Sequence, residues 1–564
     1  MSTLPSHQSL DLIERFSQSD DKLYDGFKTP DTIEAGGALR AGPPPSYSSL
    51  DVLALMSQYA SMGLLYGVTY NLSYPFLTVY FHMEGTQLTS ANALMTLAWS
   101  FKVFIGMLSD CVPVFGLRRK PYMFVGWTIN AICMLVLASV DHGLPLYIDP
   151  SLEGRPLSNL TADESRGVDA SAPSRGAFMV IMCTIAAFGQ VVAEAACDAL
   201  VVEYAQREPL HCRGRMQSLT YAIRLCAQGV TGLMFGICNN SPRFGGTYSW
   251  DIGVNGMFIL VSITSTLAVP VTIFGVKEAK RTEAVSFQTY LGQCWALAQK
   301  RAVWQIVLYL FWSTVFYCSI TTTASPYVKF YWAKVESFNS ALIMTISNCV
   351  SAGVLMLMAS YGLHWNWRVT FVVTTLIANG LDAIVQYCTI FDVFRNQWVY
   401  LGMPLAEQVP LAINWAVTMY VIVELAEDGS EGVMYGLLTT VMAMPMILGA
   451  MVTNIYCAEL QLKSTDIASD TPDVRRDVAY SYMVKYGAAA FSCCWVVLFP
   501  RQKAECAELK KNGGNYPRVG AAVLISCFVI LCVSVTSTVM SMFDATACYV
   551  FAGGQGCDLV ETSG

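Results

Sequence analysis

The feature that most constrains the fold of this chain is a series of thirteen apolar runs, each about as long as a membrane-spanning helix. A hydrocarbon core of about 30 Å needs about 20 apolar residues per helix. Hydrophobic residues make up 54% of the chain and charged residues 13%, whereas a soluble domain has roughly 25% charged residues. The sequence therefore predicts an all-α, polytopic membrane protein with runs at about 52–80, 89–110, 121–140, 176–203, 216–238, 254–276, 304–330, 339–359, 368–390, 398–424, 433–455, 481–500 and 518–543.

Two landmarks recur in the same order along the chain. The pattern P-[FY]-[LV]-x-[VF]-Y-[FW] occurs at residues 75–81 and again at 326–332. The segment Val-Val-Glu-Tyr-Ala at 201–205 is similar to Val-Ile-Val-Glu-Leu-Ala at 421–426, and a Gly follows each segment several residues later. Chance similarity among apolar helices is the alternative, but the matched positions include Pro, Glu and Gly. The repeats predict two six-helix halves, with a substrate site near the midplane between them.

The predicted organisation follows from these runs and from the polar segments between them. The Ser-, Gly- and Pro-containing start is expected to be a disordered cytoplasmic tail. A charged linker separates the halves, and an additional hydrophobic helix follows the second half. The expected segments are a tail at 1–47, halves at 48–276 and 304–500, a cytoplasmic linker at 277–303, a cytoplasmic loop at 501–517, an additional helix at 518–543 and a C-terminal tail at 544–564.

Basic residues predict the orientation, because Lys and Arg concentrate in cytoplasmic loops. They gather in the loops on the same side as the N-terminal tail, which favours a cytoplasmic N-terminus. The outer loop 141–173 then carries Asn159 in an Asn-Leu-Thr glycosylation sequence. With thirteen spans, Cys548 and Cys557 lie outside, where a disulfide persists. If 518–543 lies along the interface instead, both cysteines stay cytoplasmic and reduced.

Four ionisable residues lie within three of the predicted spans: Lys102, Glu194, Asp198 and Arg224. Such groups are costly in a membrane and usually face a bundle interior or a water-filled path. At 1.5 Å per residue, Lys102, Glu194 and Arg224 all lie about 12–13 Å from the same membrane face. Glu194 and Asp198 are four residues apart and share a helix face. We expect one charged cavity, although an ion pair that merely locks the helices together is the alternative.

Charged residues at the inner ends of the spans predict a second feature, a gate network that closes the cytoplasmic side. The segment around Glu424 matches the one around Glu203 but lacks basic partners nearby. The predicted network comprises Asp110, Arg118, Arg119, Glu203, Arg213, Arg215 and Glu424.

The second half offers further candidates for a polar cavity. Asp382 and Gln386 share one face of their span, and Glu407 and Asn414 lie on the next span.

The segment from Gly106 to Tyr122 reads GMLSDCVPVFGLRRKPY. It is similar to the signature of the major facilitator superfamily with a longer turn, and its extended form resembles the folate–biopterin transporter family. The pattern DALVVE at 198–203, followed by RGRMQS at 213–218, carries the same resemblance. The stretch CYVFAGGQGC at 548–557 resembles the ending of oomycete members. The resemblance covers about residues 50–557.

The resemblance implies import of folates, biopterin or related pterins with protons as the coupling ion, although some relatives carry S-adenosylmethionine. Arg224 would then bind a substrate carboxylate bidentately, and Lys102 would add positive charge. Glu194 or Asp198 would accept hydrogen bonds from the pterin ring or carry the proton, and Asp382 is a further substrate-binding candidate. Tyrosines at 66, 70 and 74 and aromatic residues at 309, 312 and 316 are expected either to stack on the pterin or to pack within the bundle.

Other function classes are less consistent with the sequence. It has no P-loop motif GxxxxGK[ST], which argues against a primary pump, and no metal or cofactor is expected. The five His residues are scattered over tail and loops, so a membrane enzyme is disfavoured. A non-transporting sensor with a transporter fold remains an alternative. The chain is predicted to be a multi-pass protein of the plasma membrane.

Overall fold

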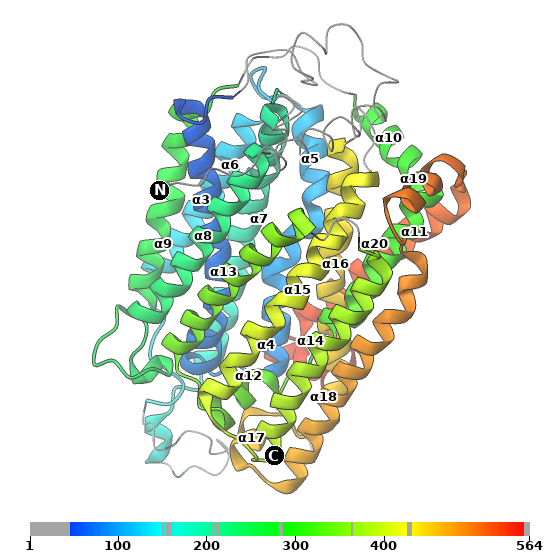
Figure 1. The fold of residues 1–564 in the computed structure, drawn as a ribbon. Helices are drawn as coiled ribbons and strands as arrows, with labels where there is room; N and C mark the ends of the chain where they lie inside the picture. The colour runs from blue at the N-terminus through cyan, green and yellow to red at the C-terminus, as the bar shows by residue number, and fades with distance from the viewer. Residues whose placement is uncertain are drawn as a thin grey trace, which may run out of the picture.

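The chain forms a helical bundle, shown in Figure 1 by the computed structural model. The structure describes residues 45–148, 152, 161, 163–205, 207–208, 215–278, 280, 286–361, 365–425 and 431–557. We call the end of the bundle where α3 begins the tail end, which is the upper end in Figure 1. The opposite end carries residues 81–84 and 541–557, and we call it the loop end.

Long helices of the first half account for the first six predicted spans. Helices α4 and α5 form one span through a short 3-10 segment, η2. The bounds are α3 Leu50–Asn71, α4 Gly85–Thr96, η2 Leu97–Phe101, α5 Lys102–Cys111, α6 Lys120–Ser139, α7 Ala172–Ala205, α8 Arg215–Cys238 and α9 Gly253–Pro270.

The second half repeats this organisation, and one more long helix, α20, follows it. Short helices lie in the two segments predicted as a linker and a loop, α10 in the first and α19 in the second. The bounds are α10 Phe287–Gln299, α11 Arg301–Thr314, α12 Ser325–Tyr327, α13 Ser337–Tyr361, α14 Trp367–Ile390, α15 Gln397–Leu425, α16 Glu431–Cys457, α17 Ser464–Ser469, α18 Pro472–Ser492, η12 Cys493–Leu498, α19 Lys503–Asn512, α20 Pro517–Met540 and α21 Asp544–Ala547.

Among the described residues, twelve helices are long and apolar enough to cross a membrane. They match twelve of the thirteen predicted runs, including the last one at Pro517–Met540. The remaining run is α15, whose side chains are described only in part, so this set of helices does not include it. Helix α15 nevertheless packs along α13 and α14 inside the second half.

One predicted span needs correction. The run at 304–330 is not one continuous helix, because the spanning segment ends at Ser319. Three threonines at 321–323 and then Pro326 follow. Pro lacks the N–H that a continuing helix needs, and the chain turns before α12.

Both copies of the first sequence landmark form π-helix at the loop end. Residues Ser73–Tyr80 form η1, and Val328–Trp332 form η10. π-Helical turns are rare and often mark functional sites. The sequence repeat therefore corresponds to a repeated backbone feature, one in each half.

The two halves meet along two helix pairs, α8 with α13 and α4–α5 with α16. At the loop end, hydrogen bonds join the halves directly. Tyr327 Oη donates to the Met83 carbonyl at 2.7 Å, and Ser464 donates to the Glu84 carboxylate from its N–H at 3.2 Å and from its hydroxyl at 3.1 Å. The structure is therefore closed at the loop end.

Candidate functional site

Lys102 and two carboxylates form the centre of the candidate site. Lys102 is the first residue of α5, and its Nζ lies 2.8 Å from Glu194 Oε1 and 2.6 Å from Asp198 Oδ2 on α7. The Glu194 side chain is 2% exposed and that of Asp198 is 16% exposed. The four-residue spacing on α7 places both carboxylates on one helix face, as the sequence predicts. We call these groups, together with Arg224, the charge cluster.

Arg224 joins the cluster from α8. Its Nη1 donates to Glu194 Oε1 at 3.0 Å, and its guanidinium lies 4.8 Å from the ring centroid of Tyr66 on α3. Gly63 makes this arrangement possible, since a Cβ there would lie 2.2 Å from the Arg224 carbonyl oxygen. Small residues allow membrane helices to approach closely. The packing of α3 on α8 thus places Tyr66 beside Arg224.

Tyr59 also belongs to this site and was not predicted from the sequence. Its hydroxyl donates to Asp198 Oδ1 at 2.5 Å, and its ring lies 6.3 Å from that of Tyr221. Glu194 Oε2 is buried and has no hydrogen-bond partner among the described residues. The cluster thus holds two cations and two carboxylates, with one acceptor oxygen unused.

The predicted gate network is described only in part. Arg119 Nη2 lies 2.6 Å from Asp110 Oδ1, so one predicted ion pair is present at the tail end. Glu203 lies partly exposed in the last turn of α7. Arg213 lies outside the described residues, and the side chains of Arg215 and Glu424 are not described either.

Glu278 was missed by the sequence analysis, although it organises the tail end of the first half. Its carboxylate accepts hydrogen bonds from the N–H groups of Arg118, Arg119 and Lys120, at 2.7 to 3.1 Å. These groups begin α6, where a carboxylate satisfies otherwise unpaired N–H groups and the helix dipole. The contact joins residues about 160 apart, and no local pattern predicts it.

The second half contains its own partly buried ion pair. Lys485 Nζ lies 2.5 Å from Asp382 Oδ2, which also accepts from Tyr486 Oη at 2.9 Å. Gln386 donates to Asp382 Oδ1 at 3.1 Å, as their shared helix face predicts. Glu407 of α15 interacts electrostatically with this pair, and its Oε1 has no hydrogen-bond partner among the described residues. Lys485 interrupts an apolar run as Lys102 does, so the same signal could have revealed it.

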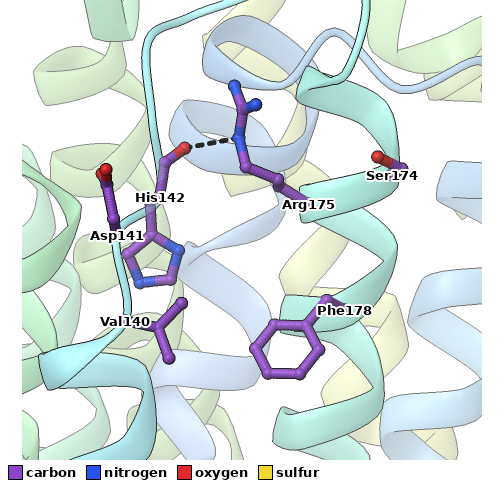
Figure 2. Close-up of a pocket in the computed structure, with 6 residues that line it drawn as sticks. All are labelled: Val140, Asp141, His142, Ser174, Arg175 and Phe178. Atoms are coloured by element: carbon purple, nitrogen blue, oxygen red, sulfur yellow. Dashed lines mark hydrogen bonds between the residues drawn. The ribbon is translucent and has the colours of Figure 1, made fainter.

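A shallow pocket of about 280 Å³ lies at the loop end, away from both charged centres. Figure 2 shows Arg175 pointing toward the backbone of His142. The Nε of Arg175 donates a hydrogen bond to the His142 carbonyl oxygen at 2.7 Å. Arg175 also pairs with Asp169 at 2.7 Å. The cation of this pocket therefore anchors the outer loop, and we assign the pocket a structural role.

The two remaining predictions concern a disulfide and a glycosylation site. Cys548 and Cys557 form a disulfide with a Cα–Cα distance of 4.9 Å. Asn159 lies outside the described residues.

The sequence matches the model of the BT1 family over residues 63–146, a segment that includes Lys102, Asp110 and Arg119. A folate-biopterin transporter of Synechocystis sp. is 23% identical over 443 residues, which cover 75% of this chain and 77% of the relative. The chain is similar to folate–biopterin transporters. A probable folate-biopterin transporter 4 of Arabidopsis thaliana is 24% identical over 138 residues, covering 24% of this transporter but only 22% of that protein.

Solved structures show the same fold. The D-xylose-proton symporter superposes with a TM-score of 0.55 at 13% identity, covering 80% of this transporter and 98% of the symporter. A mutant form of the nucleoside transporter NupG gives a TM-score of 0.52 at 12% identity, covering 80% of this transporter and 100% of that chain. The major-facilitator fold is thereby confirmed. The relatives found are transporters rather than enzymes.

Proposed function

We propose that this membrane transporter imports folate, biopterin or related pterins by alternating access, with protons as the coupling ion. The observation that carries the proposal is the charge cluster between α5, α7 and α8, next to an aromatic ring on α3. A pterin has a flat ring with hydrogen-bond donors and acceptors, and such a ring needs an aromatic surface and fixed polar groups. The relationship to folate–biopterin transporters supports the choice of substrate.

Asp198 is the carboxylate best placed to meet the substrate. Its side chain is more exposed than that of Glu194, and one of its oxygens is bound by Tyr59 while the other faces Lys102. An amino-pyrimidine edge would compete with Lys102 for this carboxylate. The competition gives the substrate a way to loosen the contact between α5 and α7.

Glu194 has a different position, because Lys102 and Arg224 both contact its Oε1. Breaking a buried ion pair costs about 3–5 kcal/mol, so this carboxylate holds three helices together. Either carboxylate, once released from a cation, is a candidate carrier of the coupling proton. Asp382 is the corresponding candidate in the second half, where Lys485 is its partner.

Alternating access requires that the contacts at one end break when the other end closes. The hydrogen bonds of Met83 and Glu84 across the halves keep the loop end closed in this structure. We assign the Asp110–Arg119 pair to the gate of the opposite end. In this proposal the N-terminus is cytoplasmic and the protein lies in the plasma membrane, so the loop end faces outward.

Uptake into proteoliposomes tests the proposal. Purified protein is reconstituted, an inward proton gradient is imposed, and labelled folate and biopterin are followed with and without excess unlabelled S-adenosylmethionine. Saturable uptake that collapses with a protonophore supports the proposal. Absence of both fluxes, or S-adenosylmethionine uptake alone, from protein shown to be folded and inserted, contradicts it.

A further inference from the structure

Lys329 is a partly buried cation that the proposed function does not use. It belongs to the second copy of the sequence landmark and lies in the π-helix η10. Its Nζ contacts Ser340 Oγ at 2.5 Å and lies 4.3 Å from the ring centroid of Tyr74. Within the described part of the chain, no carboxylate oxygen lies within the 4.0 Å ion-pair distance of this ammonium.

The cations of the charge cluster and of the ion pair in the second half are compensated. Lys102 and Arg224 contact Glu194, and Lys485 contacts Asp382. Two cations and two carboxylates leave the charge cluster with no net charge to attract an anion. A hydroxyl and an aromatic face compensate Lys329 only in part, because neither carries the full negative charge of a carboxylate. An anion beside Lys329 would offset the remaining cost of burial.

A row of three tyrosines, Tyr66 and Tyr70 on α3 and Tyr74 on η1, connects Lys329 with the charge cluster. Tyr66 lies against Arg224, its hydroxyl is 3.0 Å from that of Tyr70, and Tyr74 lies against Lys329. Eight residues separate the first from the last, which is about 12 Å along the helix. The row therefore ends at a cation on each side.

The tyrosine row lies beside the second half, and its middle residue is exposed. Tyr70 is 42% exposed although it lies near the middle of the span Leu50–Tyr80. It interacts electrostatically with Arg224 on its own half and with Cys318 on the other half. Cys318 is exposed as well. A flat solute between the halves would thus meet the tyrosine row along its length.

We propose that Lys329 binds the anionic end of the substrate while the ring system lies along the tyrosine row toward Arg224. The inference rests on the proposed function and adds a specificity-determining residue to it. A folate, whose glutamate carries carboxylates, uses Lys329. Biopterin has the same pterin ring without carboxylates and does not need this lysine.

Binding of folate and biopterin to purified Lys329→Met and Lys329→Arg variants tests the inference. Lys334 is exposed and provides the matched control, Lys334→Met. We expect Lys329→Met to weaken folate binding at least tenfold with biopterin binding unchanged, and Lys329→Arg to restore most of the folate affinity. Equal losses for both ligands, or no loss for either, would overturn the inference.

A third ligand separates this inference from the proposed function. If the wild-type protein binds neither folate nor biopterin, the proposed function fails. p-Aminobenzoylglutamate, which keeps the carboxylates and one ring but lacks the pterin, then tests Lys329 by thermal shift. If p-aminobenzoylglutamate raises the melting temperature of the wild type but not of Lys329→Met, the anion site at Lys329 is supported. If it does not raise the melting temperature of the wild type, the inference is overturned.

Discussion

The ammonium of Lys102 lies 2.8 Å from a carboxylate oxygen of Glu194, and the two residues are 92 positions apart in the chain. Asp198, one turn further along α7, contacts the same ammonium at 2.6 Å. One lysine on α5 thus bridges both carboxylates of the cluster, and Arg224 adds α8 through Glu194. Stability and transport are therefore expected to depend on the same few side chains.

Replacement of Lys102 by Met should destabilise the protein strongly. The variant leaves two buried carboxylates with Arg224 as the remaining cation, and loss of one partner of a buried pair costs about 3–5 kcal/mol. Lys102→Arg keeps the charge and should recover part of the loss. Thermal unfolding in detergent measures both variants, and an unchanged melting temperature for Lys102→Met would contradict the geometry.

The loop end should fail to close when Gly85 gains a side chain. A Cβ on Gly85 in α4 would lie 2.1 Å from the Thr323 carbonyl oxygen of the other half. Gly380→Ala on α14 is the matched control, because nothing lies within 4 Å of the corresponding Cβ. We expect Gly85→Ala to lower uptake at least tenfold and the control to lower it little. Equal uptake by the two variants would show that closure does not need this contact.

Asp470 predicts a pH dependence of stability at the loop end. Burial raises its pKa, but hydrogen bonds from Arg395 and Arg475 outweigh this effect and lower the pKa from 3.8 to about 2. A depressed carboxyl pKa stabilises the fold above the unfolded value and loses this contribution as the pH falls toward 2.

The variant Asp470→Asn should therefore be less stable than the wild type at pH 5 and above, by about 1–2 kcal/mol. The difference should shrink between about pH 4 and pH 2. Melting temperatures of both proteins across this range measure it. A difference that grows as the pH falls would have the wrong sign.

The disulfide between Cys548 and Cys557 tests the topology. Helix α20 carries the chain from the tail end to the loop end, so a cytoplasmic N-terminus places both cysteines outside. A membrane-impermeant maleimide should label intact cells in excess of a Cys548→Ser/Cys557→Ser control only after mild reduction. Equal labelling of the two proteins after reduction would place these cysteines inside.

Much of the fold follows from the sequence, because about 20 apolar residues have few options in a membrane other than a helix. Breaks within spans are harder to predict. The turn after Ser319 passes through three threonines before Pro326, and the hydrogen bonds of such side chains form only in the folded bundle. Thr322, for example, shares a hydrogen bond with Ser481.

The charge cluster could be predicted because depth along a helix and a four-residue spacing are local properties. Two further partners could not be predicted, namely Tyr59, which binds Asp198, and Glu278, which binds the Arg119 N–H group. Tyr59 looks like any aromatic residue in an apolar run, and Glu278 looks like a solvated linker charge. Their roles come from helix packing, which brings together residues more than 100 positions apart.

The role of the charge cluster in transport is tested by uptake of labelled folate and biopterin in cells that express wild-type protein or Arg224→Ala. We expect saturable uptake of at least one substrate by the wild type and a loss of at least tenfold in the variant, at equal surface expression and after correction for any change in melting temperature. Wild-type uptake that Arg224→Ala leaves intact would contradict the claim that the charge cluster is the transport site.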